Sequence, residues 1–172
     1  ASSAASDVYK RQTINSGYGS NTWSTSLLNK TNLNTNFITN IGTEWANKID
    51  MTTWKVGGNT GVNIEQQPAK TAYQNEIVQP NPGTTSNGET EDNKKIGLMY
   101  ASDYGFAAAP SAWTTNLYYY DGEAIKSANW MYLGDYEWTI SRNADNSNNA
   151  FNVNNDGNVN NNNVNNNNAV RP

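Results

Sequence analysis

The stretch NADNSNNAFNVNNDGNVNNNNVNNNN, residues 143–168, holds the pattern from which the fold of this chain can be argued. More than half of its positions are Asn, and single apolar residues interrupt the run at Phe151, Val153, Val159 and Val164. Asp156-Gly157 is a strong two-residue turn signal. Because strand side chains alternate between faces, the stretch predicts a β-hairpin with its apolar residues inside and its Asn side chains outside.

Upstream of this hairpin the pattern mixes helix with strand. Ile41, Trp45 and Ile49 follow one another at four-residue spacing, which predicts a helix over Thr43–Met51 with Thr43 as its N-cap. The β-branched and aromatic run Thr52–Val56 predicts a strand that ends in a turn at Gly57-Gly58.

Two more segments have strand character. Ile96–Tyr100 is a short apolar run, and within Asn129–Ile140 apolar and aromatic residues alternate with others at Trp130 and Tyr132 and again from Tyr136 to Ile140. These elements together predict an α+β fold with short helices and small antiparallel sheets.

Two segments are expected to lie outside the core. Ser2–Gln12 (SSAASDVYKRQ) resembles translated sequencing-adapter sequence, so residues 1–12 are interpreted as a non-native or disordered leader that packs against nothing. Gln79–Lys95 is rich in Pro, Gly, Thr, Ser, Asn and acidic residues, which predicts a surface loop. Residues 13–172 then form a single domain.

The composition argues against several classes of partner. With 11 basic and 15 acidic residues, the formal net charge is −4, so a nucleic-acid backbone would find no basic surface here. No apolar run reaches the roughly 18 residues of a membrane span. The 6 Trp and 10 Tyr can build a core and can also serve recognition.

Candidate catalytic and metal-binding groups are few. The chain has no Cys and no His, which removes thiol and imidazole chemistry and the usual zinc sites. Asp135 and Glu137 are the nearest carboxylate pair, two apart on one strand face, but such groups are more commonly solvated or bound to an Arg such as Arg142. Asp145 and Asp156 could offer oxygen to calcium, without regular ligand spacing. We therefore expect no catalysis, no metal and no cofactor.

Several segments, taken in order, resemble the variable proteins of diversity-generating retroelements. These are C-type-lectin-like surface proteins of bacteria and phages, related in fold to formylglycine-generating enzymes. The resemblance rests on Glu44-Trp45 with Thr53–Gly58, on Ile96–Ala107 (IGLMYASDYGFA), on Tyr136–Arg142 (YEWTISR), and on Phe151–Pro172 with its closing Val-Arg-Pro. It implies a C-type-lectin-like fold whose last strand would follow Arg171-Pro172, so that this chain would be truncated there. The related enzymes work through cysteines, so the shared fold implies no catalysis.

The resemblance also implies a function for the Asn-rich segment. In such systems adenines of a template repeat are mutated during reverse transcription, and an Asn codon ending in a pyrimidine can change at both adenines without creating a stop codon. The chain would be a non-catalytic surface-display protein, extracellular or at the cell surface with its anchor outside this chain, and its partner an unidentified protein or glycan. The implied variable ligand face consists of Asn152, Asn154, Asn155, Asn158, Asn160, Asn161, Asn162, Asn163, Asn165, Asn166, Asn167 and Asn168.

Two other interpretations remain open at this point. The chain could be a structural cell-surface or pilin-like subunit with a static polar surface, or the Asn-rich segment could be a solvated tail without a partner. Tyr118-Tyr119-Tyr120 and Trp113 could line a sugar-stacking pocket, but we interpret them as core and rim. The triplet Asn29-Lys30-Thr31 matches a glycosylation acceptor and is given no functional weight.

Overall fold

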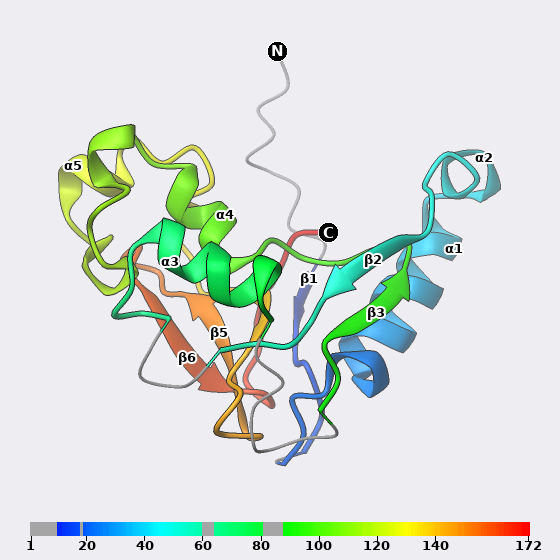
Figure 1. Cartoon of the computed structure of the whole chain (residues 1–172). Coiled ribbons are helices and arrows are strands. Elements are labelled where there is room, and N and C mark those ends of the chain that lie inside the picture. Colours follow the sequence, from blue (N-terminus) through cyan, green and yellow to red (C-terminus); the bar gives the residue numbers. More distant parts are fainter. Residues whose placement is uncertain (1–9, 18, 60–63, 81–87) are drawn as a thin grey trace.

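The computed structural model describes residues 10–17, 19–59, 64–80 and 88–172, which adopt an α+β arrangement (Figure 1). The main sheet contains five strands in the order β1 (Lys10–Gln12), β7 (Asn168–Val170), β4 (Glu137–Arg142), β5 (Asn149–Val153) and β6 (Val159–Asn163). Its β4–β7 pair is parallel and its other pairs are antiparallel. A smaller antiparallel sheet pairs β2 (Thr52–Lys55) with β3 (Glu91–Lys94).

Short helices connect these strands and cover them. They are η2 (Trp23–Thr25), η3 (Leu28–Phe37), α1 (Ile38–Asn40), α2 (Thr43–Ala46), α3 (Ala69–Tyr73), η4 (Gln74–Val78), α4 (Ala101–Phe106), η5 (Pro110–Ala112), η6 (Leu117–Tyr119) and α5 (Glu123–Lys126). In Figure 1, α3, α4 and α5 lie at one end of the molecule, while α1, α2 and the small sheet lie at the other. The main sheet runs between these two groups.

Two hydrophobic cores lie on opposite faces of the main sheet. Phe151, Val153 and Val159 belong to the core that includes residues of α3 and α4. Trp138, Ile140 and Ala150 belong to the other core, together with apolar residues of η3. Because neighbouring side chains of a strand point to opposite faces, β4 has both faces covered, and all six of its residues are buried.

The predicted hairpin is confirmed. Its strands pair in register from Asn149↔Asn163 to Val153↔Val159, so Phe151, Val153 and Val159 share one face as expected. Gly157 in the turn has φ +103°, a left-handed conformation that favours glycine, and a Cβ there would lie 3.2 Å from the Tyr120 carbonyl oxygen. The apolar alternation is therefore as predicted, but the turn is not a two-residue one. The Asn154 amide donates to the Asn158 carbonyl at 2.8 Å, so three residues, Asn155–Gly157, form the loop, and the register differs by one from that of a two-residue turn at Asp156-Gly157.

The predicted helix at Thr43–Met51 is much shorter than expected, because α2 ends at Ala46 and Gly42 occupies its N-cap position. Trp45, which suggested a buried face, is 65% exposed. The longest helical segment instead runs through η3 into α1 and was not predicted. η3 is a π-helix, in which Leu28, Leu33 and the following Ile38 stand five positions apart, a spacing that a search for α-helical periodicity misses.

The strand predictions are confirmed in part. The prediction at Thr52–Val56 matches β2, and the one from Tyr136 to Ile140 matches β4. Trp130 and Tyr132 do not form a strand: they follow α5 in a turn, and Trp130 is 79% exposed. Ile96–Tyr100 is irregular, although the Met99 carbonyl accepts a hydrogen bond of 2.9 Å from the Ile140 amide.

Two segments expected to lie outside the fold contribute strands to it. The last part of the predicted loop at Gln79–Lys95 is β3, whose charged residues give little strand signal until β2 pairs with it. The expectation that residues 1–12 pack against nothing is wrong for Lys10–Gln12, which form β1 beside β7. The Trp138 indole nitrogen also donates to the Gln12 carbonyl at 2.8 Å. Residues 1–9 lie outside the described residues.

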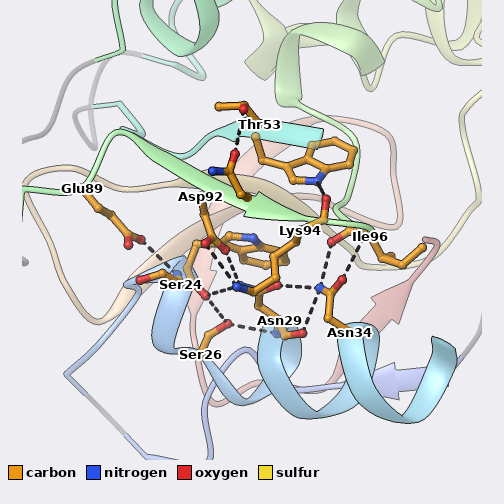
Figure 2. Close-up of polar contacts among 12 residues, drawn as sticks. Ser24, Ser26, Asn29, Asn34, Thr53, Glu89, Asp92, Lys94 and Ile96 are labelled. Carbon is orange, nitrogen blue, oxygen red and sulfur yellow. Dashed lines mark hydrogen bonds and ion pairs between the residues drawn. The ribbon is translucent and has the colours of Figure 1, made fainter. Parts of the chain in front are cut away.

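A buried polar network fastens the π-helix to the small sheet (Figure 2). The Asn29 side-chain amide donates to the Trp23 carbonyl at 3.0 Å and to Asp92 Oδ2 at 2.8 Å. The Asn34 side chain donates to the Ile96 carbonyl at 3.0 Å and accepts from the Ile96 amide at 2.9 Å. Asn29 is fully buried, so the glycosylation triplet that begins there is structural in this fold.

A second buried polar contact fixes the start of α4. Glu76 of η4 accepts hydrogen bonds from the Ala101 amide at 3.2 Å, from the Ser102 amide at 3.0 Å, and from the Ser141 hydroxyl. Its carboxyl group thereby caps α4 and ties it to β4. Burial raises the pKa of Glu76 to about 7, although the hydrogen bonds from Ser141 and Ser102 oppose the shift.

This raised pKa predicts a pH dependence of stability. The native state holds the Glu76 proton more tightly than the unfolded chain does, so the unfolding free energy should fall as the pH rises from about 4.5 to about 7. The contribution is at most about 3 kcal/mol. Urea denaturation across this range should give a shallower slope for Glu76→Gln than for the wild type. Glu123→Gln, which changes an exposed carboxylate, should keep the full slope. Equal slopes in all three proteins would contradict the prediction.

Candidate functional site

The Asn-rich segment includes β5, β6, the turn between them and the first residue of β7. β5 and β6 lie at one edge of the main sheet, while β7 lies on the other side of β4 (Figure 1). The predicted ligand-face residues differ in how far their side chains are exposed to solvent, and they form three groups. Asn155, Asn166 and Asn167 are exposed. The half-buried group comprises Asn154, Asn160, Asn161, Asn162, Asn163 and Asn165. Asn152, Asn158 and Asn168 are buried.

The expectation that every Asn side chain faces outward is wrong for Asn152, Asn158 and Asn168. Sequence alternation predicted a hairpin with one buried face, whereas the sheet has a core on each side. Asn152 stands opposite Trp138 in the β4–β5 register and shares its face of the sheet. Its side chain is therefore enclosed together with that buried indole.

A hollow of about 450 Å³ opens among the remaining Asn side chains. It is lined by Tyr136 and by Asn162, Asn166, Asn167 and Asn168. These residues come from the segment that precedes β4, from β6, from the second turn and from β7. An aromatic ring surrounded by amides offers an apolar surface together with donors and acceptors, which suits recognition of a polar ligand.

Contacts from the rest of the chain hold this segment mainly through its backbone. The Tyr104 hydroxyl donates to the Gly157 carbonyl and the Tyr132 hydroxyl to the Asn155 carbonyl, each at 2.7 Å. These two bonds fix the hairpin turn. The Thr139 hydroxyl likewise donates to the Phe151 carbonyl at 2.8 Å.

The flanking loops are held in the same way. The buried Asn21 side chain donates to the backbone carbonyls of Asn143 at 2.6 Å and Asn149 at 2.7 Å. Beyond β6, the Ile14 amide donates to the Val164 carbonyl at 2.9 Å. A backbone anchored in this manner keeps its course when the side chains it carries are exchanged.

Asn side chains of the segment bond largely to one another. Asn152 donates to Asn154 at 2.8 Å, and Asn166 donates to Asn162. Asn161 is the exception, because its side chain accepts from Asn149 and also shares a hydrogen bond with Glu65, which lies outside the segment. The hydrogen bonds between Asn side chains are thus local to the segment.

The three buried Asn residues are poorly satisfied. Asn152 Oδ1, Asn158 Oδ1 and Asn168 Nδ2 are buried and find no hydrogen-bond partner among the described residues. A buried amide atom without a partner costs on the order of 1–3 kcal/mol. Asn21 Oδ1 and Asn59 Nδ2, outside the segment, likewise lack a partner among the described residues, so the cost is not confined to the Asn-rich segment.

The two candidate acid–base residues are each paired with an Arg, and they do not share one environment. Asp135 precedes β4 and forms an ion pair with Arg11 at the surface. Glu137 is buried and accepts from Arg171 Nε at 2.9 Å. Burial raises the pKa of Glu137 to about 7, against the opposing charge of Arg171. Both carboxylates thus have structural partners.

The suggested partner Arg142 is engaged elsewhere. Its Nε donates to the Val56 carbonyl at 2.7 Å, and its Nη2 donates to the Glu89 carbonyl at 3.0 Å. These bonds tie β4 to the end of β2 and to the backbone just before β3.

Clusters of metal-binding side chains and membrane-spanning helices are absent from the described ranges. Within them no three acidic, His or Cys side chains gather as a metal site would require. The Asp156 carboxylate accepts from the Asn158 amide at 3.3 Å within the hairpin turn. None of the helices in the described part of the chain has the length and apolar character needed to cross a membrane.

Comparison with known proteins gives no identification. No family model, curated protein or solved structure matches this chain. The function has to follow from the geometry of the site.

Sequence reasoning missed Tyr136, Tyr104 and Tyr132 as residues of this site. Tyr136 was expected inside a strand, but it precedes β4 and is 38% exposed in the hollow. Tyr104 and Tyr132 reach the hairpin turn from distant parts of the chain, and no local spacing signals such contacts. In both Tyr104 and Tyr132 the side-chain hydroxyl donates to a backbone carbonyl, and only the structure shows these contacts.

The two turn anchors differ in burial, which predicts different effects. Tyr104→Phe leaves the buried Gly157 carbonyl without its donor and should lower the unfolding free energy by about 1–2 kcal/mol. Tyr132→Phe removes an exposed bond that water can replace, so its effect should stay below about 0.5 kcal/mol. Urea denaturation of both variants measures the difference. Equal losses of unfolding free energy in the two variants would show that the buried Tyr104 hydroxyl contributes no more to stability than the exposed Tyr132 hydroxyl.

The poorly satisfied amide of Asn152 predicts a stabilising substitution. Asn152→Val removes the unpartnered Oδ1 and places a β-branched side chain in a central strand. Even with the bond to Asn154 lost, the unfolding free energy should rise by about 1 kcal/mol. Thermal melting tests this, with Asn155→Val at the exposed turn as a neutral control. A clear loss of stability in Asn152→Val would instead make this Asn a structural requirement.

Proposed function

We propose that this chain is a non-catalytic ligand-binding surface-display protein whose Asn-rich segment is a hypervariable face diversified by adenine-directed mutagenesis. One observation carries the proposal: the segment is anchored by hydrogen bonds to its backbone carbonyls, from Tyr104, Tyr132, Thr139 and Asn21. Side chains can then change without loss of the scaffold, which is what a diversified surface requires.

The poor fit of the buried Asn residues also supports this proposal. Where Asn152, Asn158 and Asn168 are enclosed with unpartnered amide atoms, folding alone would favour other side chains. An Asn excess that originates in the codons rather than in the fold explains their presence. In this interpretation the present copy resembles the undiversified template.

The genetic code separates the apolar and glycine positions of the segment from its Asn positions. Asn codons begin with two adenines, whereas codons for Phe, Val and Gly have no adenine in their first two positions. Phe151, Val153, Gly157, Val159 and Val164 are all buried. The residues that the core and the turn need are thus the ones that adenine-directed change spares.

The structure narrows the proposed ligand face. The exposed and half-buried Asn residues around the 450 Å³ hollow remain candidates for direct contact, with Tyr136 as a constant aromatic residue among them. Asn152 and Asn158 are enclosed, so their substitution would act on the scaffold before it acts on a ligand. The ligand class, protein or glycan, would depend on the side chains of each diversified copy.

Sequencing the gene segment for residues 143–172 in many cells of the source population tests the proposal. Substitutions should concentrate at the adenines of the Asn codons, and above all at those of Asn155, Asn160, Asn166 and Asn167. Codons for the five buried apolar and Gly positions serve as the internal control and should stay fixed. Asn codons no more variable than the rest of the gene would favour a structural surface subunit with a static polar face.

A further inference from the structure

A second cavity is lined by residues outside the Asn-rich segment. It has a volume of about 600 Å³ and is bordered by Glu65, Gln66, Asn116, Tyr118 and Tyr119. This volume falls within the 300–1,000 Å³ typical of small-molecule sites. We propose that this cavity is a saccharide-binding subsite, which the hypothesis of a variable face neither uses nor requires.

The two Tyr rings are unusually open to solvent. Tyr118 is 43% and Tyr119 60% exposed, and the rings meet edge to face with centroids 5.4 Å apart. The interpretation of this cluster as core and rim is therefore consistent with the structure, because Tyr120 is buried and its two neighbours are exposed at the border of the cavity. Adjacent exposed aromatic side chains are a common feature of binding sites, because they bury apolar area when a ligand arrives.

The floor of the cavity is rigid before any ligand binds. The Tyr118 amide donates to the Glu65 carbonyl at 2.7 Å, and the Leu117 amide donates to the Gln67 carbonyl at 3.0 Å. The hydroxyl of buried Tyr120 donates to the Gly105 carbonyl at 3.0 Å. Because η6 is held from both sides, little entropy would be lost in ordering the site.

The polar groups of the cavity suit a hydroxyl-rich, uncharged ligand. Gln66 and Asn116 each offer an amide that both donates and accepts, and Glu65 offers acceptors. A sugar ring matches this set, since its hydroxyls can donate to the carboxylate and exchange hydrogen bonds with the amides. Its apolar C–H faces can lie against the Tyr rings.

Charge argues against ionic ligands. Among the described lining residues Glu65 is the only acidic one and none is basic, which disfavours phosphates and other anions. A cation would need a freely available carboxylate, but Glu65 is half-buried and already hydrogen-bonded to Asn161. Its Oε2 is buried without a partner among the described residues, so a small rotation of the carboxyl group would present an unused acceptor to the cavity.

The same Glu65–Asn161 bond connects the cavity to the Asn-rich face. β6 lies beside η6 in the fold, so a ligand held by the Tyr pair would extend toward the side chains of β6. The cavity would hold one sugar unit, and the neighbouring Asn-rich face would contact the group attached to that sugar.

Saturation-transfer difference NMR of the full chain with a panel of methyl glycosides tests the subsite. At least one glycoside should receive saturation, with dissociation constants then measured by chemical-shift titration. Tyr119→Ala should weaken the binding about tenfold, the loss typical of an anchoring aromatic side chain, while Tyr119→Phe should retain most of it. Glu65→Gln should also weaken binding. Because Tyr119 is exposed, its variants should melt at the wild-type temperature, which separates lost binding from lost folding.

Three controls test whether the change in glycoside binding is specific to the cavity. Trp45→Ala removes another exposed aromatic side chain, on α2, and should leave the dissociation constant unchanged. The double variant Asn166→Ser with Asn167→Ser should also leave it unchanged, because neither residue is among those that line the cavity. Methylguanidinium serves as the cationic probe and should bind more weakly than the best glycoside.

Several outcomes would overturn the subsite. They are no saturation transfer to any glycoside, undiminished binding by Tyr119→Ala, loss of binding in the double Asn variant, and tighter binding of methylguanidinium. None of these results bears on whether the Asn codons vary, so the subsite and the variable face can fail separately.

Discussion

The burial of β4 on both faces is the constraint on which the rest of the structure depends. Glu137–Arg142 alternates between two cores, so its polar side chains need partners inside the protein. Arg171 pairs with Glu137, and Glu76 accepts from Ser141 while it caps α4. The Arg142 guanidinium reaches the backbone beyond β2. Each of these contacts fixes the position of a different element of the fold. The main sheet in turn positions the Asn-rich hairpin through β5 and β7.

Much of the hairpin could be predicted from local sequence, because strand alternation and a turn-forming glycine act over a few positions. Phe151, Val153 and Val159 mark its inner face, and Gly157 marks its turn, but the three-residue loop and the resulting register are known only from the structure. The second core behind it could not be predicted, since the residues that cover Asn152 come from distant segments. For the same reason the sequence did not distinguish enclosed Asn side chains from exposed ones.

Other elements could not be predicted from the sequence, because their strand pairing or the spacing of their apolar residues is unusual. In the π-helix η3 the apolar residues recur every five residues. The charged strand β3 is stabilised by its pairing with β2 rather than by its own composition. The Tyr118–Tyr120 cluster shows the same limit, because one ring is buried and two are open, depending on which side of η6 each leaves. Residue type suggested a binding surface there, but only the fold separates the two roles.

The pairing of β1 with β7 has a mechanical consequence. Lys10 stands opposite Val170 in an antiparallel pair, so the first residue of β1 and the last residue of β7 lie at the same end of the sheet. Tension between these two points would open the β1–β7 hydrogen bonds one after another instead of loading them together in shear. Pulled this way, the sheet would yield first at its β1 edge, while the hairpin at the opposite edge would stay paired until β7 and β4 had separated.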